Sequence, residues 1–252
     1  MMERRTVMKY FFTVFLLLMV SSSANVGGET VSYEVDGKPF EGYFISPSPK
    51  APLVLLIHDW DGLTDYEIKR ANMLADIGYA VFVADLFGAG VRPTEEKDKR
   101  QHTGELYSDR EKMRALLQGA LETAELKGAN IVNAVAIGYC FGGAAVLELA
   151  RSGADLKGFV TFHGGLSTPA GQDYSKTKGK LLILHGTADE IITMDHFAGL
   201  ADELEAHGVP HEMITYGGAP HAFTIFGSNR YRKDADKKSW NRFTAFLAQT
   251  LK

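Results

Sequence analysis

The segment IVNAVAIGYCFGGAAVLELAR, from Ile131 to Arg151, holds a strand, a tight turn and a helix in immediate succession. The apolar run that ends at Ile137 predicts a buried strand, and the alanine-rich end of the segment predicts a helix. Between them, GYCFGG runs from Gly138 to Gly143. A strand, then G-x-C-x-G-G, then a helix is the pattern of a nucleophile elbow with cysteine in place of serine.

The turn places Cys140 where its sulfur is most reactive. A nucleophile elbow is sharp, so Gly138 and Gly142 supply room that a side chain would fill. The N-terminus of the following helix stabilises a thiolate through its dipole and free N–H groups. Cys140 is the only cysteine, so no intramolecular disulfide is possible. A lone cysteine is otherwise a buried small hydrophobe, and the surrounding motif favours the nucleophile instead.

Outward from this segment, apolar runs alternate with amphipathic ones. The further expected strands are Leu53–Ile57, Ala80–Ala84, Gly158–Phe162, Leu181–Leu184 and Glu212–Tyr216. The further expected helices are Asp65–Ile77, Glu105–Leu126, Met194–His207 and Ala235–Leu251. Two β-rich runs, Glu29–Val35 and Lys38–Ser46, flank an Asp-Gly turn and predict a hairpin. The fold expected is α/β: a mostly parallel, doubly wound sheet with an antiparallel N-terminal edge.

The composition is that of an ordinary globular protein. Of 252 residues, 45% are hydrophobic and 23% are charged, and the net charge of −4 is too small to indicate a nucleic-acid or anionic-membrane partner. The charged run from Glu95 to Arg100 alternates in sign, as on a solvated helix or loop face. Without an internal repeat or a long linker, residues 25–252 are expected to form one domain.

The first 24 residues differ from the rest. Three basic residues, Arg4, Arg5 and Lys9, precede an apolar run of about 11 residues, and small residues up to Ala24 follow. This is the pattern of a secretory signal peptide, and the run is too short for a typical membrane span. The prediction is a protein exported to the periplasm or secreted, with no stable membrane span once the signal is removed.

Chain order supports a catalytic triad. In folds with this elbow the nucleophile precedes an acid and then a histidine. Asp189 follows the expected strand at Leu181–Leu184, and His221 lies in a glycine-rich loop before the last helix. Carboxyl ends of parallel strands meet at one edge of the sheet, so Cys140, Asp189 and His221 are expected to meet there.

At these residues the sequence resembles the dienelactone hydrolase family, within the α/β-hydrolase superfamily. The resemblance spans roughly 30–250 and rests on GYCFGG at 138–143, HGTAD at 185–189 and HAF at 221–223. It also rests on HDWDGL at 58–63, on Gly78-Tyr79 and on DLFG at 85–88.

The resemblance implies a hydrolase of small carboxylic esters or lactones. Cys140 would attack the carbonyl, His221 would transfer the proton and Asp189 would orient His221. The backbone N–H groups of Phe141 and Trp60 would hold the oxyanion.

Two positions depart from the family's pattern. The family has a glutamate that pairs with the resting thiol where this chain has Asp59, which is one methylene shorter. The family's H-x-F-x-R carries a carboxylate-binding arginine where this chain has Ile225. A neutral substrate is therefore a candidate beside a dienelactone. Arg92 and Arg230 are the candidates to replace the missing carboxylate-binding arginine. Tyr139 and Arg92 are the expected substrate contacts.

No cofactor or metal is expected. His58, His163 and His185 each follow a separate strand without metal-ligand spacing, so packing roles are favoured. No nucleotide-binding glycine motif follows the first strand. The partner expected is a small ester or lactone, and the sequence leaves the oligomeric state open.

Two other functions remain open. A hydrolase of another acyl compound, such as a thioester or a small peptide amide, would use the same triad. A non-catalytic ligand-binding or redox-sensing protein on the same fold would use Cys140 as its responsive thiol.

Overall fold

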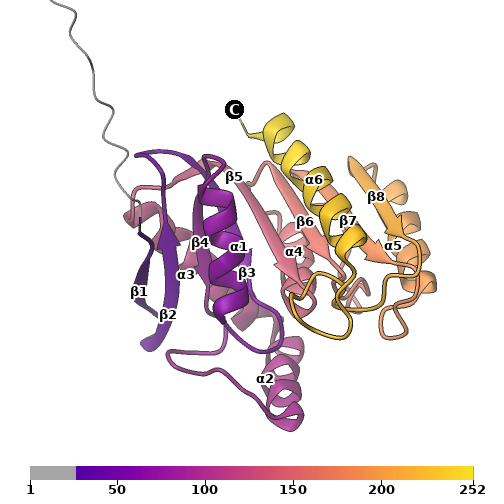
Figure 1. Cartoon of the computed structure of the whole chain (residues 1–252), viewed down its shortest axis with the longest axis horizontal. Coiled ribbons are helices and arrows are strands. Elements are labelled where there is room, and N and C mark those ends of the chain that lie inside the picture. Colours follow the sequence, from indigo (N-terminus) through magenta and orange to yellow (C-terminus); the bar gives the residue numbers. More distant parts are fainter. Residues whose placement is uncertain (1–26, 252) are drawn as a thin grey trace, which may run out of the picture.

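The computed structural model describes residues 27–251, so the expected signal peptide at 1–24 lies outside the described residues. The strands are β1 (Glu29–Val35), β2 (Lys38–Ile45), β3 (Pro52–Ile57), β4 (Ala80–Ala84), β5 (Asn130–Tyr139), β6 (Gly158–Phe162), β7 (Lys180–Gly186) and β8 (His211–Tyr216). The helices are α1 (Asp65–Ala75), α2 (Glu96–Ser108), α3 (Arg110–Leu126), α4 (Phe141–Arg151), α5 (Met194–Ala206) and α6 (Lys233–Thr250). Figure 1 shows them around one twisted sheet.

The sheet is mostly parallel, as the sequence predicts. Within the described residues its order is β1-β2-β4-β3-β5-β6-β7-β8. β1 and β2 form the expected hairpin, and β2 joins β4 in antiparallel register. All pairings from β4 to β8 are parallel. The chain moves outward from β3 to β4 and then returns to the other side of β3 with β5, which makes the β3/β5 border the switch point where ligands bind in such sheets.

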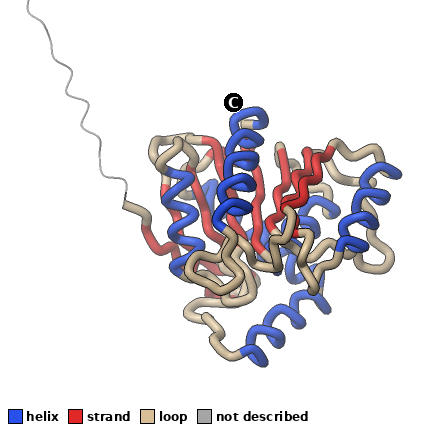
Figure 2. Tube along the Cα trace, turned by 45° about the vertical axis from the view of Figure 1, so that its right-hand side comes forward, coloured by secondary structure: helices blue, strands red, loops and turns tan. Residues whose placement is uncertain are grey.

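The central strands are apolar because helices cover both of their faces. Leu53–Ile57 of β3 and the whole of β4 are fully buried. One face packs against α1 and α6, and the other against α3, α4 and α5. Figures 1 and 2 show these two helical layers with the sheet between them. A strand buried on both faces reads as a continuous apolar run, which is why LVLLI and AVFVA were recognisable.

The predicted helix Glu105–Leu126 is wrong, because the structure divides that stretch. Asp109 departs from helical backbone geometry, with φ −121° and ψ 83°, and ends α2. Its side chain accepts a hydrogen bond from the backbone N–H of Lys112 and caps α3. An aspartate that caps a helix satisfies free N–H groups at the first turn, so it begins a new helix. The charged run from Glu95 to Arg100 lies at the start of α2, with Glu95 as the N-cap residue.

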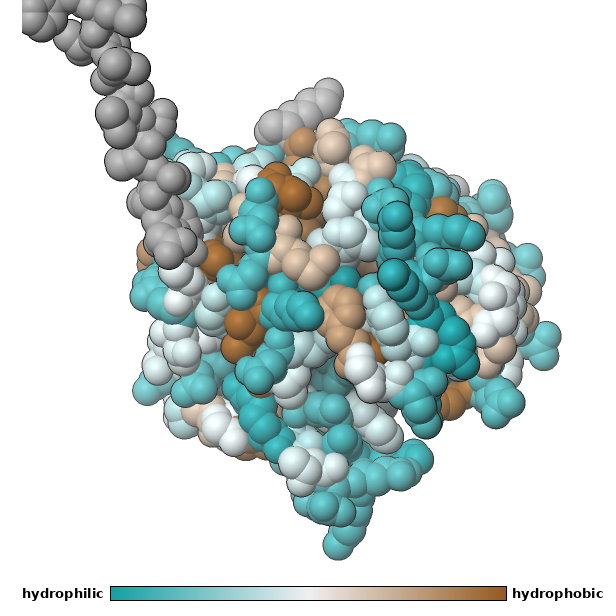
Figure 3. Space-filling model, in the orientation of Figure 1, coloured by the Kyte–Doolittle hydropathy of each residue, from teal (hydrophilic) through white to brown (hydrophobic). Residues whose placement is uncertain are grey.

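α2 lies apart from the two helical layers. It is beyond the carboxyl ends of the parallel strands, at the lower edge of Figure 1. Its outer surface is hydrophilic (Figure 3). Loops gather at the same edge of the sheet (Figure 2). None of the helices in residues 27–251 is both long and apolar enough to cross a membrane.

Candidate active site

Cys140 occupies a strained turn between β5 and α4. Its φ is +51° and its ψ is −112°, a conformation that residues with a side chain rarely adopt. A Cβ on Gly138 would lie 2.1 Å from the carbonyl oxygen of Gly142, and one on Gly142 would lie 2.4 Å from that of Ile57. Both positions therefore require glycine, and the turn is as tight as the elbow motif predicts. Such strain is typical of functional sites.

The structure brings Cys140, His221 and Asp189 into one chain of contacts. Nε2 of His221 lies 3.0 Å from Sγ of Cys140, and Nδ1 lies 2.8 Å from Oδ2 of Asp189. The other carboxylate oxygen of Asp189 accepts the N–H groups of Ile191 and Ile192, both at 2.9 Å. The carboxylate is therefore fixed on one side and presents its free oxygen to the imidazole.

Within this triad of contacts, each charged group favours the charged form of its neighbour. Burial opposes a positive charge on His221, but hydrogen bonds and negative charge from Asp189 and Cys140 outweigh it and raise the pKa of His221 to about 10. Burial also disfavours ionised Asp189, but the hydrogen bond and charge of His221 hold the pKa of that carboxyl below its ordinary value. At neutral pH the histidine is therefore a cation, with its N–H aimed at the sulfur.

Two residues that line the pocket have backbone N–H groups without an acceptor among the described residues. Phe141 is the first residue of α4, and Trp60 lies in the loop after β3. Neither N–H donates to an acceptor within residues 27–251, and both residues line the pocket that contains Cys140. The partial positive charge of a helix N-terminus adds to the attraction for an anion at Phe141. Free backbone N–H groups are the donors from which oxyanion holes are built.

His58 fixes the loop that carries Trp60. Its Nδ1 lies 2.6 Å from the backbone oxygen of Asp59, and its Nε2 accepts the N–H of Leu86 at 3.1 Å. Complete burial lowers the pKa of His58 to about 4, so the ring is neutral at physiological pH. The neutral ring ties the loop after β3 to the loop after β4. In residues 27–251, no group of His, Cys, Asp or Glu is arranged to hold a metal ion.

Asp59 lines the same pocket as Cys140. Its Oδ1 accepts the N–H of Asp61 at 2.9 Å, and among the described residues it makes no hydrogen bond to the thiol. Burial and the negative charge of Asp61 raise the pKa of Asp59 to about 6, while the charge of His221 acts in the opposite direction. Asp59 therefore interacts electrostatically with the His221 imidazolium.

The pocket over the sulfur has a volume of about 350 Å³, which suits a small molecule. Its lining residues are Asp59, Trp60, Glu96, Arg100, Thr103, Tyr107, Cys140, Phe141, Ile191, His221, Ala222 and Arg230. Four of them come from α2, which therefore forms one wall of the site.

Little in the sequence of α2 indicates that this helix contributes to the pocket. Its charged first turns are typical of a solvated helix, and only two of its residues, Thr103 and Leu106, are buried. The side chain of Tyr107 nevertheless reaches the pocket and meets the ring of Phe141 edge to face at 5.5 Å. An isolated aromatic residue near the end of a polar helix was the one available signal.

Two expected substrate contacts lie elsewhere. Arg92 is absent from the pocket lining. Its guanidinium donates to the backbone oxygen of Val91 at 2.7 Å and lies 3.7 Å from Asp85. Tyr139 is fully buried and its ring stacks on Phe162 at 4.8 Å. Neither side chain is positioned to touch a ligand in this pocket.

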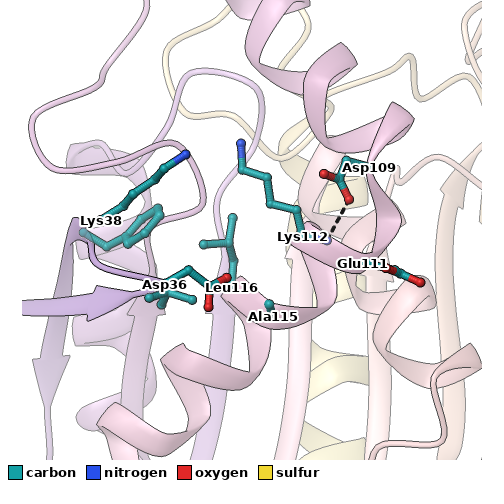
Figure 4. Close-up of a pocket in the computed structure, with 9 residues that line it drawn as sticks. Asp36, Lys38, Asp109, Glu111, Lys112, Ala115 and Leu116 are labelled. Carbon is teal, nitrogen blue, oxygen red and sulfur yellow. Dashed lines mark hydrogen bonds between the residues drawn. The ribbon is translucent and has the colours of Figure 1, made fainter.

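A second cavity, of about 420 Å³, lies between the β1–β2 hairpin and α3. Figure 4 shows Lys38 and Lys112 directed toward the same side of it, with Asp109 turned to the backbone of Lys112. Its lining contains no histidine or cysteine and no nucleophile paired with a base. The cavity at Cys140 is therefore the stronger candidate for chemistry.

The part of the chain that is similar to known proteins includes the residues of this site. The sequence profile of the dienelactone hydrolase family matches residues 40–251. A protein of Saccharolobus solfataricus named as a carboxymethylenebutenolidase is 24% identical over 259 residues, covering 88% of this chain and 98% of its own. A crystal structure of a dienelactone hydrolase-like promiscuous phosphotriesterase from metagenomic libraries matches with a TM-score of 0.84 and 29% identity, over 90% of this chain and 99% of its own. A structure named m3DLH matches with a TM-score of 0.85 and 30% identity, over 91% and 100%.

Proposed function

Because the chain belongs to the dienelactone hydrolase family, we propose that it is a cysteine-dependent hydrolase of small carboxylic esters or lactones. Cys140 is the nucleophile, His221 the proton carrier and Asp189 the residue that orients and charges His221. The observation that carries the proposal is the 3.0 Å contact between His221 and the sulfur of a cysteine on a strained elbow, in a pocket that two residues with free N–H groups line.

The first half of the reaction forms a thioester. With the proton resting on His221, the sulfur of Cys140 attacks the carbonyl carbon, and the oxyanion accepts the N–H groups of Phe141 and Trp60. Collapse of this intermediate breaks the ester C–O bond. His221 gives its Nε2 proton to the departing alkoxide, which leaves as an alcohol or, from a lactone, stays attached as a hydroxyl.

The second half regenerates the enzyme. Neutral His221 takes a proton from water as the water oxygen attacks the thioester carbonyl. The same two N–H groups hold the second oxyanion. Its collapse breaks the C–S bond and returns the electron pair to sulfur, so the carboxylic acid leaves and the thiolate again faces a protonated His221.

The pocket supports a small substrate with an apolar part. Trp60, Tyr107 and Ile191 supply apolar surface. Arg100 is already paired with Glu96, at 2.5 Å, and Ile225 stands where the family has an arginine. Arg230 is the remaining guanidinium in the lining, and it is exposed. We therefore propose neutral esters and lactones as the main substrates.

The test uses p-nitrophenyl acetate and a series of neutral and carboxylate-bearing lactones. Hydrolysis by the wild-type protein, and its loss in Cys140→Ala and after alkylation, is the expected result. Since Cys140 is the only cysteine, alkylation reports on this thiol alone. Turnover that survives Cys140→Ala would disprove the cysteine mechanism. Preference for carboxylate-bearing lactones, abolished by Arg230→Gln, would disprove the neutral substrate class.

Phosphotriester hydrolysis is a second candidate. The dienelactone hydrolase-like relative at 29% identity is described as a promiscuous phosphotriesterase. A thiolate beside an oxyanion hole can also attack phosphorus, because the developing negative charge falls on the phosphoryl oxygen. An aryl phosphotriester added to the same substrate panel tests this activity. The expected result is release of the phenol by the wild-type protein and no release by Cys140→Ala.

We also propose that the chain is exported, with residues 1–24 as its signal peptide. Support comes from the basic, apolar and small-residue segments in that order. Mass spectrometry of the protein recovered from its native host would find Asn25 at the N-terminus if the signal is cleaved after Ala24. An intact Met1 or Met2 would contradict cleavage.

A further inference from the structure

A buried charged group lies beneath the loop that carries His221. Arg70 of α1 is fully buried, and its guanidinium forms an ion pair with Asp236 of α6. The same nitrogen, Nη2, donates to the backbone oxygen of Thr224 at 3.0 Å. The loop from His221 to the start of α6 is therefore tied to helices on either side of it, three residues beyond the histidine.

A line of side chains runs from this ion pair to the active-site histidine. Nε of Arg70 donates to the hydroxyl of Tyr66 at 3.2 Å. That hydroxyl lies 2.8 Å from Oγ1 of Thr224, which lies 2.8 Å from Nε2 of His163. The ring of His163 meets the ring of His221 edge to face at 5.3 Å. The hydroxyl of Thr224 therefore links the buried Arg70–Asp236 ion pair to the two histidines.

The backbone on both sides of this link is strained. His163 has a φ of +41° and Ala222 has a φ of +61°, and neither is glycine. Such conformations persist where the surrounding contacts hold them. His163 follows β6 and Ala222 follows His221 directly, so the bonds around Thr224 fix two strained turns against each other.

The charge on each ring fits this arrangement. Burial, followed by the positive charge of His221, holds the pKa of His163 well below its ordinary value. His163 is therefore neutral while His221 is a cation, and the two rings contact without repulsion. The other groups that face His221 are Asp189, Cys140 and, electrostatically, Asp59.

We propose that Thr224 is a positioning residue, whose hydroxyl holds His163 against His221 and thereby sets the His221–Cys140 distance. This inference rests on the proposed function, since it concerns the same site. A purely space-filling role would be served equally by valine, which has the same shape as threonine. The hydrogen bonds to both Tyr66 and His163 argue for the hydroxyl itself.

The test compares Thr224→Val, which removes only the hydroxyl, with Thr224→Ser, which keeps it. We expect Thr224→Val to lower kcat by about 10- to 100-fold with KM little changed, because a displaced proton carrier slows chemistry more than binding. Thr224→Ser should keep most of the activity. Equal activity in Thr224→Val and wild type, or equal loss in Val and Ser, would overturn the proposal.

A second readout separates this inference from the proposed function. The rate of Cys140 alkylation as a function of pH reports on the sulfur–imidazolium pair even if no ester is turned over. We expect the alkylation profile of Thr224→Val to move toward that of an ordinary thiol, and that of Thr224→Ser to match wild type. A wild-type alkylation profile in Thr224→Val overturns the positioning role. Absence of ester turnover in the wild type would instead overturn the proposed function.

Tyr66→Phe guards against a folding artefact. It removes the hydroxyl that holds Thr224 and leaves the contact with His163 in place. We expect a smaller loss of kcat than in Thr224→Val, and no further loss in the double variant, because both act through one link. Fully additive losses would overturn the proposal, and thermal unfolding of each variant identifies any that fails to fold.

Discussion

At the scale of single residues, the sulfur of Cys140 is surrounded by groups whose charges depend on one another. His221 is a cation because Asp189 and Cys140 favour its proton. Asp59 approaches from the loop after β3, and burial keeps it protonated until about pH 6. The charge of His221 lowers the pKa of Asp59, and by reciprocity ionised Asp59 favours the imidazolium.

This reciprocity predicts the pH dependence of the thiol. Above about pH 6 the carboxylate of Asp59 is charged and strengthens the cation beside Cys140; below it, that support is lost. The alkylation rate of the wild-type protein should therefore rise through an inflection near pH 6. Asp59→Asn should remove this inflection and leave the rest of the profile intact. Asp202→Asn, an exposed position on α5, is the control. An unchanged inflection in Asp59→Asn would assign it to another group.

The sequence was informative about residues whose backbone position alone defines their role. Cys140, Asp189 and His221 each follow a strand at the same edge of the sheet, and the structure brings them together. Side-chain direction was harder to foresee. Tyr139 precedes Cys140 at the end of β5, where successive side chains alternate between faces, so it points into the layer beneath α1 and α6. Arg92 is drawn to Asp85 by charge.

At the scale of elements, the start of α1 depends on an unusual glutamate. Thr64 and Glu67 form a capping box, in which Oε2 of Glu67 accepts the N–H of Thr64 at 2.9 Å and its hydroxyl at 2.7 Å. Burial, followed by the charge of Asp59, raises the pKa of Glu67 to about 8. The folded protein therefore keeps this side chain neutral through physiological pH.

Glu67→Gln should make the folding stability less dependent on pH. In the unfolded chain Glu67 ionises near its ordinary pKa of 4.5, whereas in the folded protein it ionises near 8. Ionisation thus favours the unfolded state increasingly between these values, and the wild type loses stability as pH rises through this window. A glutamine oxygen can accept the same bonds without ionising. The Tm of the variant relative to wild type should increase from pH 5 to pH 8. A constant difference would contradict the assignment.

α2 illustrates an element whose role depends on tertiary contacts. Lys99 pairs with Asp61 at 2.6 Å and lies over the ring of Trp60 at 5.3 Å. These contacts link α2 to the loop that carries Trp60, the proposed oxyanion donor. The helix has few buried residues, so its apolar pattern could not predict that it covers a pocket. Its separation from α3 at Asp109 directs it over the carboxyl ends of the strands (Figure 1).

Tyr107 should contribute to substrate binding more than to chemistry. Its ring lines the pocket and contacts Phe141, but among the described residues it has no hydrogen bond to the side chains of Cys140, Asp189 or His221. Tyr107→Ala should raise KM for an aryl ester by about 10-fold, the cost of losing one apolar wall, with kcat within a few-fold of wild type. Tyr107→Phe is the matched control and should retain KM. A large loss of kcat in both variants would instead give the hydroxyl a role in the reaction.

At the scale of the whole molecule, sequence alone predicted the sheet because its central strands are apolar on both faces. Their order could not be read from any one strand, since a parallel sheet is assembled from distant segments. The pocket belongs to the same scale: its walls come from the loops after β3, β5, β7 and β8 and from α2. Each piece alone is an ordinary loop or polar helix, and the cavity exists only when they meet.

The continuity of the sheet predicts that the molecule unfolds as one unit. Hydrogen-bonded pairing runs without a gap from β1 to β8, and each central strand contributes side chains to the hydrophobic clusters on both faces. Loss of one cluster would expose the apolar face of strands that the other still holds, so the two cannot melt independently. Calorimetry should give one transition, with the calorimetric enthalpy equal to the van't Hoff enthalpy. Separate transitions, or an enthalpy ratio well above one, would divide residues 25–252 into more than one folding domain and contradict the single-domain prediction.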